Sequence, residues 1–279
     1  MKTILTVAAA ICIVYLLLIA FYAVMQRSLI YYPTALSSEQ AKQQAKVLGG
    51  APWLSRDGHW LGWKTEGATA SSVANRPRAL VFHGNAGMAL NRDYYADLLS
   101  GFRASGPWEV YVFEYPGYGP REGSPGEAAF SAAAVQAMDE LLQQNTSPLL
   151  IIGESIGSGV ATELVRRRPD AVRALMLITP FDSLANVARH HMPYLPVGLL
   201  LRDRYDNLAA LRNYQNPLIV VTAGQDTIVP TTLAAPLLEQ HQGPALHETQ
   251  IHADHNGLHF EPARSPWPEV DRFLLINRD

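Results

Sequence analysis

The chain has 279 residues, of which 48% are hydrophobic and 17% are charged, and its formal net charge at pH 7 is −3. This apolar content is sufficient for a sizeable core and excludes an intrinsically disordered protein. A nearly neutral chain lacks the concentrated Lys and Arg that binding to a phosphate backbone requires, so we expect no nucleic acid partner. The single cysteine, Cys12, excludes a disulfide framework and a thiolate metal site.

The N-terminal segment is predicted to be a membrane-spanning helix. Residues 4–25 form an uncharged, mostly apolar run, which at ~1.5 Å per residue is long enough to cross a hydrocarbon core of ~30 Å. A cleaved signal peptide is the alternative, but its apolar region is usually ~7–15 residues, and Phe21-Tyr22-Ala23 is a poor cleavage site. We therefore expect a retained single-pass anchor at residues 1–27 and one folded domain at residues 28–279. Basic residues on both sides of the run leave the membrane orientation open. The anchor is expected to contribute little to the geometry of a site in the domain.

The rest of the chain alternates short apolar runs with segments of helical periodicity. The apolar runs, which are predicted strands, lie at 79–82, 110–113, 149–152, 174–178, 218–222 and 245–251, with an earlier antiparallel strand at 59–64. The predicted helices lie at 92–103, 127–144, 157–168, 231–240 and 268–276. Nearly continuous apolarity is typical of strands buried on both faces of a parallel sheet. The alternation predicts a doubly wound, mostly parallel α/β sheet, whose ligands bind at the carboxyl ends of the strands.

The run Gly153-Glu154-Ser155-Ile156-Gly157 follows one of these strands directly and precedes a predicted helix. In such a strand–turn–helix the serine sits in strained backbone, and the small neighbours let strand and helix approach each other. The helix N-terminus also presents unpaired N–H groups beside the serine. A turn of small residues is the structural alternative, and a phosphate loop is excluded because no Gly-Lys-Ser/Thr follows. We predict that Ser155 is a nucleophile.

A serine nucleophile needs a base, and the base needs an acid that orients it. In sheets with such a turn these residues follow the serine in the order acid, then histidine. Asp226 and His255 each stand in a loop behind a predicted strand in that order, and we predict them as acid and base. Asp182, behind the preceding strand, is the competing acid, and His252 is the reserve base.

Two further histidines, His247 and His259, lie close to His252 and His255 in the sequence, and together they raise the possibility of a zinc site. No thiolate joins them, and the chain has no His-Glu-x-x-His sequence. We therefore expect neither a metal nor another cofactor.

The oxyanion of an acyl-transfer reaction needs two N–H donors that point at the developing charge. The backbone N–H of Ile156, directly after the nucleophile, is one predicted donor. The backbone N–H of Asn85 is the other, because it lies in the small-residue loop His83-Gly84-Asn85-Ala86-Gly87 behind the first predicted parallel strand. We expect His83 itself to have a structural role.

These motifs resemble, in their order along the chain, those of the α/β-hydrolase superfamily. Two further runs carry the resemblance, Tyr115-Pro116-Gly117-Tyr118-Gly119 and Thr179-Pro180-Phe181-Asp182-Ser183. More narrowly, the chain is similar to the membrane-anchored branch that includes bud-emergence-type proteins and eukaryotic protein depalmitoylases. The resemblance covers about residues 28–277 and implies the same site residues: Ser155, Asp226 and His255 as catalytic triad, with Asn85 and Ile156 as oxyanion donors. One departure is Ile251-His252-Ala253-Asp254, where that branch has a glycine-rich approach to the histidine.

Residues 184–211 are predicted to form a short cap. Its apolar residues either line an acyl-binding surface or simply cover the sheet; they are Met192, Tyr194, Leu195, Leu199, Leu200 and Leu201. The sequence thus predicts a membrane-anchored serine hydrolase that cleaves carboxylic esters or thioesters, some of them lipidic, without a cofactor. A serine peptidase on the same fold and a non-catalytic membrane scaffold are the alternatives, although a scaffold would need none of the site residues.

Overall fold

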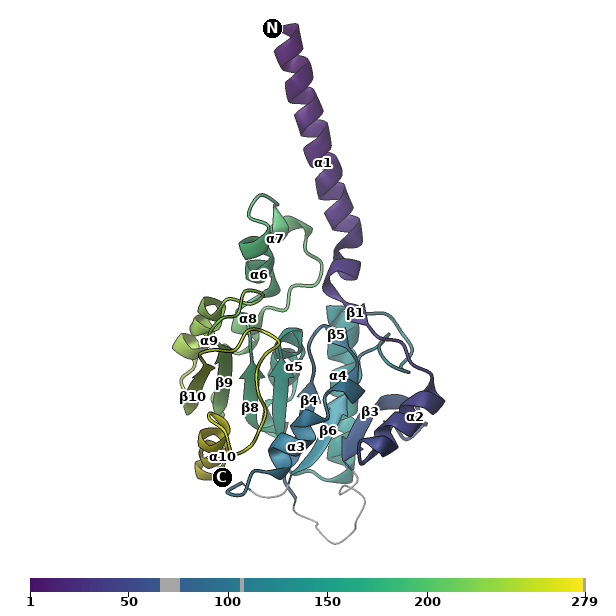
Figure 1. Cartoon of the computed structure of the whole chain (residues 1–279), viewed down its shortest axis with the longest axis vertical. Helices are drawn as coiled ribbons and strands as arrows, with labels where there is room; N and C mark the ends of the chain where they lie inside the picture. Colours follow the sequence, from purple (N-terminus) through teal and green to yellow (C-terminus); the bar gives the residue numbers. More distant parts are fainter. Residues whose placement is uncertain (66–75, 106–107, 278–279) are drawn as a thin grey trace.

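The computed structural model describes residues 1–65, 76–105 and 108–277, and its centre is an eight-stranded sheet (Figure 1). In the order in which they lie across the sheet, the strands are β10 (Ala245–Gln250), β9 (Leu218–Ala223), β8 (Val172–Ile178), β7 (Leu149–Glu154), β4 (Arg78–Phe82), β6 (Glu109–Phe113), β3 (Trp60–Thr65) and β2 (Gly50–Leu54). All neighbouring pairs from β10 to β6 are parallel, whereas β3 and β2 are added antiparallel. The predicted doubly wound, mostly parallel sheet is therefore confirmed.

Alternating residues of the central strands supply two separate hydrophobic cores. On β7, Leu149 and Ile151 are buried in one core, and Leu150 and Ile152 in the other. The first core is covered by α4 (Glu127–Gln144), α5 (Ile156–Arg167) and α9 (Ala235–Gln240). The second is covered by α2 (Ser38–Val47), α3 (Tyr94–Ser100) and α10 (Trp267–Ile276). Burial of both faces explains why the strands lack polar alternation in the sequence.

Two of the predicted helices are interrupted. The helix predicted at 92–103 is the short 3-10 turn η2 (Ala89–Asn91) followed by α3, which ends before Gly101. The helix predicted at 231–240 is the 3-10 turn η4 (Thr231–Leu233) followed by α9, which has Pro236 in its first turn. Proline has no backbone N–H and is favoured at the start of a helix, so it restarts the helix there instead of continuing it.

Helix α1 (Lys2–Ile30) extends away from the sheet, with the N-terminus at its far tip (Figure 1). Its most apolar stretch has a mean hydropathy of 2.9 and is entirely unburied, which makes α1 a candidate transmembrane helix. The helix continues past the predicted boundary at residue 27 and leads into β1 (Tyr32–Pro33), which pairs in parallel with β5 (Ala86–Gly87). The short cap consists of α6 (Leu184–His191), α7 (Val197–Leu200) and α8 (Asn207–Ala210), and α6 and α7 stand beside the lower part of α1 (Figure 1).

Candidate active site

The strand–turn–helix predicted around Ser155 is present at the carboxyl end of β7. Ser155 has φ 53° and ψ −118°, a strained conformation for a residue other than glycine, and its N–H donates to the carbonyl of Ile178 at 2.9 Å. Helix α5 begins at the next residue. A Cβ atom on Gly157 would lie 2.2 Å from the carbonyl oxygen of Phe82, so this glycine is what allows α5 to pack against the end of β4.

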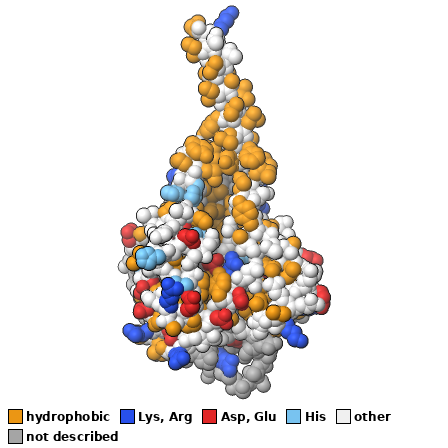
Figure 2. Space-filling model, in the orientation of Figure 1, with side chains coloured by type: hydrophobic (Ala, Val, Ile, Leu, Met, Phe, Trp, Pro, Cys, Tyr) orange, Lys and Arg blue, Asp and Glu red, His pale blue; other side chains and the backbone are white. Residues whose placement is uncertain are grey.

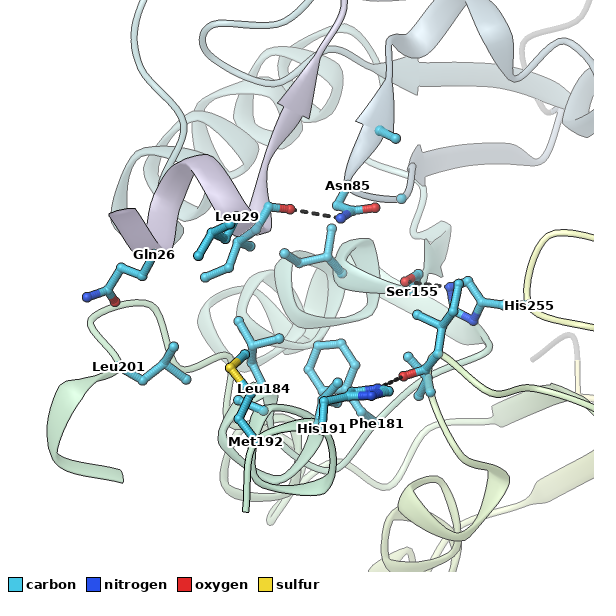
Figure 3. A pocket seen from close by; sticks show the side chains of 18 of the residues that line it. Gln26, Leu29, Asn85, Ser155, Phe181, Leu184, His191, Met192, Leu201 and His255 are labelled. Atoms are coloured by element: carbon cyan, nitrogen blue, oxygen red, sulfur yellow. Dashed lines mark hydrogen bonds between the residues drawn. The ribbon is translucent and has the colours of Figure 1, made fainter. Parts of the chain in front are cut away.

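Three loops bring Ser155, His255 and Asp226 into one hydrogen-bonded line. The Nε2 atom of His255 lies 3.0 Å from the Ser155 hydroxyl (Figure 3). Its Nδ1 atom lies 2.6 Å from Oδ2 of Asp226. The Asp226 side chain is only 1% exposed, and its other oxygen accepts hydrogen bonds from the backbone N–H groups of Ile228 and Val229. In this arrangement the imidazole can take the serine proton while the buried carboxylate holds its tautomer.

The loops that carry Asp226 and His255 are tied to each other. The N–H of Gly224 donates to the carbonyl of Gln250, and the N–H of Gln225 donates to the carbonyl of Ala253, both at 2.9 Å. A Cβ atom on Gly224 would lie 2.4 Å from the carbonyl oxygen of Ile251, so only glycine permits this approach. The glycine on the Asp226 side therefore allows the close contact although the approach to His255 contains none.

The alternative acid and base lie elsewhere. The carboxylate of Asp182 accepts hydrogen bonds from the Ser183 N–H and the Asn186 amide at the start of α6. The side chain of His252 is exposed, and His247 is exposed on β10. The Nδ1 atom of His259 lies 3.3 Å from a carboxylate oxygen of Glu261. Among the residues that the structure describes, no three His, Cys, Asp or Glu side chains converge as metal ligands.

The two predicted oxyanion donors, Asn85 and Ile156, both line the pocket that contains Ser155. Ile156 is the first residue of α5, so its N–H belongs to the unpaired first turn of the helix. Asn85 is fixed by three contacts. Its carbonyl accepts hydrogen bonds from the Tyr32 N–H at 3.0 Å and from the Tyr118 hydroxyl at 2.7 Å, and its side-chain amide donates to the carbonyl of Ile30 at 2.8 Å. The last residue of α1 is thus bonded directly to the loop of the candidate donor.

A polar cluster behind Ser155 was missed by the sequence reasoning. Oε2 of Glu154 accepts hydrogen bonds from the Tyr94 hydroxyl at 2.7 Å and the Tyr95 hydroxyl at 3.0 Å, and it lies 3.4 Å from Nε of Arg92. Burial, reinforced by the charge of Glu154, raises the pKa of both tyrosines above the ordinary value, so their hydroxyls stay protonated and donate. The only feature of the sequence that could have indicated this cluster is the position of Glu154 directly before the predicted nucleophile.

His83 is fully buried, as a structural role requires. Its Nδ1 atom lies 2.8 Å from the carbonyl oxygen of Gly84, and its Nε2 atom lies 3.4 Å from the buried carboxylate of Glu114. The same carboxylate accepts the N–H of Ala89 at 3.1 Å. These contacts fix the chain around the loop of Asn85.

Ser155 opens into a pocket of about 390 Å³, within the ~300–1,000 Å³ that is usual for small-molecule sites. Four of the six predicted cap residues line it: Met192, Leu195, Leu200 and Leu201. The other two, Tyr194 and Leu199, are exposed on the outside of the cap. Four residues of α1 line the same pocket: Tyr22, Gln26, Leu29 and Ile30. The expectation that α1 contributes little to the geometry of the site is therefore wrong.

The fold and the strand–turn–helix define the protein as an α/β hydrolase. Residues 77–202 match the family model for the alpha/beta hydrolase fold. An esterase from Pyrococcus furiosus, PF2001, superimposes with a TM-score of 0.62 over 90% of this chain and 98% of its own, at 15% identity.

The chain belongs to the α/β-hydrolase family. An uncharacterized protein of Mycobacterium tuberculosis is 34% identical over 92% of this chain and 89% of its own length. Lysophosphatidylserine lipase ABHD12 of Danio rerio is 31% identical over 61% of this chain and 48% of its own length. Protein bem46 of Schizosaccharomyces pombe is 26% identical over 58% of this chain and 55% of its own. The chain thus matches about half the length of the two named relatives, and the predicted resemblance to the bud-emergence branch is confirmed.

Proposed function

We propose that this protein is a membrane-anchored serine hydrolase that cleaves acyl esters or thioesters. Residues 1–27 would serve as the anchor and residues 28–279 as the hydrolase domain. The observation that carries the proposal is the line of hydrogen bonds from Ser155 through His255 to Asp226 at the edge of a mostly apolar pocket. The name of the lysophosphatidylserine lipase relative favours an acyl ester over a peptide bond.

In the proposed reaction, the Ser155 hydroxyl attacks the acyl carbonyl while Nε2 of His255 takes its proton. Asp226 holds the imidazole tautomer and stabilises the imidazolium that forms. The backbone N–H groups of Asn85 and Ile156 bind the oxyanion, and each such donor typically lowers the barrier by ~3–4 kcal/mol. His255 then protonates the leaving alcohol or thiol, and a water that it deprotonates releases the acid from the acyl-enzyme. No step requires a cofactor.

A covalent probe tests the nucleophile. We expect a fluorophosphonate to label the wild-type protein and Ser155→Ala to lose both the label and the hydrolysis of p-nitrophenyl acetate. Ser131→Ala is the matched control because Ser131 is a buried serine on α4, outside the pocket. Stable labelling of Ser155→Ala would contradict the proposal. Turnover of aminoacyl amides in preference to esters and thioesters would instead favour the peptidase.

A further inference from the structure

The pocket extends from Ser155 to the junction of α1 and the cap. Ser155 and His255 lie at one end in Figure 3, and Gln26 and Leu201 lie at the other. Between the two ends, Leu29 of α1 faces Leu184 and Met192 of the cap across the pocket (Figure 3). The candidate transmembrane helix therefore supplies one wall of the space in front of Ser155.

Polar contacts fix this wall to the cap. The Gln26 amide donates to the carbonyl of Leu200 at 3.2 Å, and its oxygen accepts the N–H of Arg202 at 2.7 Å. The guanidinium of Arg27 donates two hydrogen bonds of 3.0 Å to the carboxylate of Asp203. Gln26 is only 7% exposed, so a polar residue in the apolar helix is buried where the cap satisfies it.

Residues 192–201, which we call the cap apex, are the second observation. The cap apex has no charged side chain, and it carries two exposed large hydrophobic residues, Tyr194 at 59% and Leu199 at 87%. The hydroxyl of Tyr15, halfway along α1, donates to the carbonyl of Tyr194 at 2.7 Å. If α1 spans a bilayer, the cap apex beside it meets hydrocarbon and not water. In Figure 2, hydrophobic side chains cover α1 and the surface at its lower end, while most charged side chains on this face lie on the domain below.

We infer that the slot between α1 and the cap apex is a lateral entrance through which the acyl chain of a bilayer lipid reaches Ser155. Leu29 would then be a specificity-determining residue that sets how long a chain fits. The inference rests on the proposed function and names its substrate class. An acyl chain on this route moves from one apolar environment to another, so the protein need not extract it into water.

The chain-length preference of variants tests the role of Leu29. The full-length protein would be reconstituted in phosphatidylcholine vesicles, and kcat/KM would be measured for the acetate, dodecanoate and hexadecanoate esters of p-nitrophenol. We expect Leu29→Trp to lower the ratio of dodecanoate to acetate at least about tenfold, because even one misplaced methylene in an apolar pocket changes discrimination ~10–200-fold. Leu29→Ala should shift the preference toward hexadecanoate. Val24→Trp is the matched control, since Val24 lies on the same helix, is 72% exposed and is outside the pocket lining.

The outcomes separate the inference from the proposed function. Ratios that do not move in either Leu29 variant, or that fall equally in Val24→Trp, would overturn the lateral entrance while leaving the hydrolase proposal standing. A wild-type protein that hydrolyses neither ester would overturn the proposed function and the inference with it.

Photocrosslinking tests the route without turnover. Vesicles would contain Ser155→Ala protein and a phospholipid with a diazirine in the middle of its acyl chain. We expect crosslinks at Phe181 and Leu184, which line the pocket interior, as well as on the outer part of α1. Crosslinks confined to residues 4–21 would mean that acyl chains only surround the helix, and would overturn the inference.

Discussion

Asp226 and Asp182 both follow a parallel strand and both precede the histidine in sequence, so position alone does not separate them. Their hydrogen bonds do. Asp226 is bonded to Nδ1 of His255, whereas the Asp182 carboxylate is engaged at the start of α6. This difference gives opposite expectations for two conservative substitutions.

We expect Asp226→Asn to lower kcat by about 10⁴-fold, because an amide in this place selects the wrong imidazole tautomer. Asp182→Asn should cost less than about tenfold, since it disturbs only the first turn of α6. Kinetics on p-nitrophenyl acetate, with thermal unfolding of both variants as a control for folding, measure the two losses. The reverse ranking would assign the acid to the loop behind β8.

The residues of the candidate site were predictable where the chemistry leaves a local pattern. Glycines on both sides of Ser155 mark the turn. The order of serine, acid and histidine along the chain then narrows the choice of the acid and the base. The cluster of Glu154 with Tyr94 and Arg92 has no such pattern, because its members are brought together by the packing of α3 against the sheet. Side chains about sixty positions apart meet there without any periodicity that links them.

At the scale of elements, the strands were predictable because burial on both faces removes polar residues from them. The sequence analysis did not predict helix α2, although its first turn carries a recognisable capping pattern. Helix α2 starts with a capping box in which Ser37 and Gln40 bond each other's backbone, a pattern visible in the sequence. The contacts between α1 and the cap were not predictable, since apolar residues that face a bilayer and apolar residues that face a pocket are of the same types.

Those contacts change what a truncation of α1 should do. We expect removal of residues 1–20 to keep most of the acetate-ester turnover, because Tyr22 to Ile30 remain. Removal of residues 1–27 should lower it at least tenfold, since the pocket loses part of its wall and Asp203, only 4% exposed, loses its guanidinium partner. A charged hydrogen bond of this kind is worth on the order of 1–3 kcal/mol. Equal turnover of the two truncated proteins, both checked by fluorophosphonate labelling, would show that the wall is dispensable.

At the scale of the whole molecule, the exposed apolar surface is concentrated at one end, on α1 and the cap apex. The helix α1 and α7 of the cap extend from the same end of the sheet (Figure 1). Ser155, which follows β7, lines the pocket whose walls α1 and the cap supply. The doubly wound sheet was predictable from alternation alone. The placement of α1 and the cap apex at one end of the molecule was not predictable, because it depends on the direction in which α1 leaves the domain. That direction is set by the pairing of β1 with β5 and by the hydrogen bonds of Gln26 and Arg27 to the cap.

If α1 spans a bilayer, the hydrogen bond from the Asn85 side chain to the carbonyl of Ile30 would couple the thickness of that bilayer to the proposed reaction. A membrane helix answers a thinner or thicker hydrocarbon layer by changing its tilt. The end of α1 is bonded to Asn85, whose backbone N–H would bind the oxyanion. A change of tilt would therefore shift the position of that N–H. We expect the full-length protein to hydrolyse p-nitrophenyl acetate at different rates in short-, medium- and long-chain phosphatidylcholine vesicles. The same protein without residues 1–20 should show no such dependence. It has lost the part of α1 that would cross the bilayer but has kept the end of α1 that is bonded to Asn85.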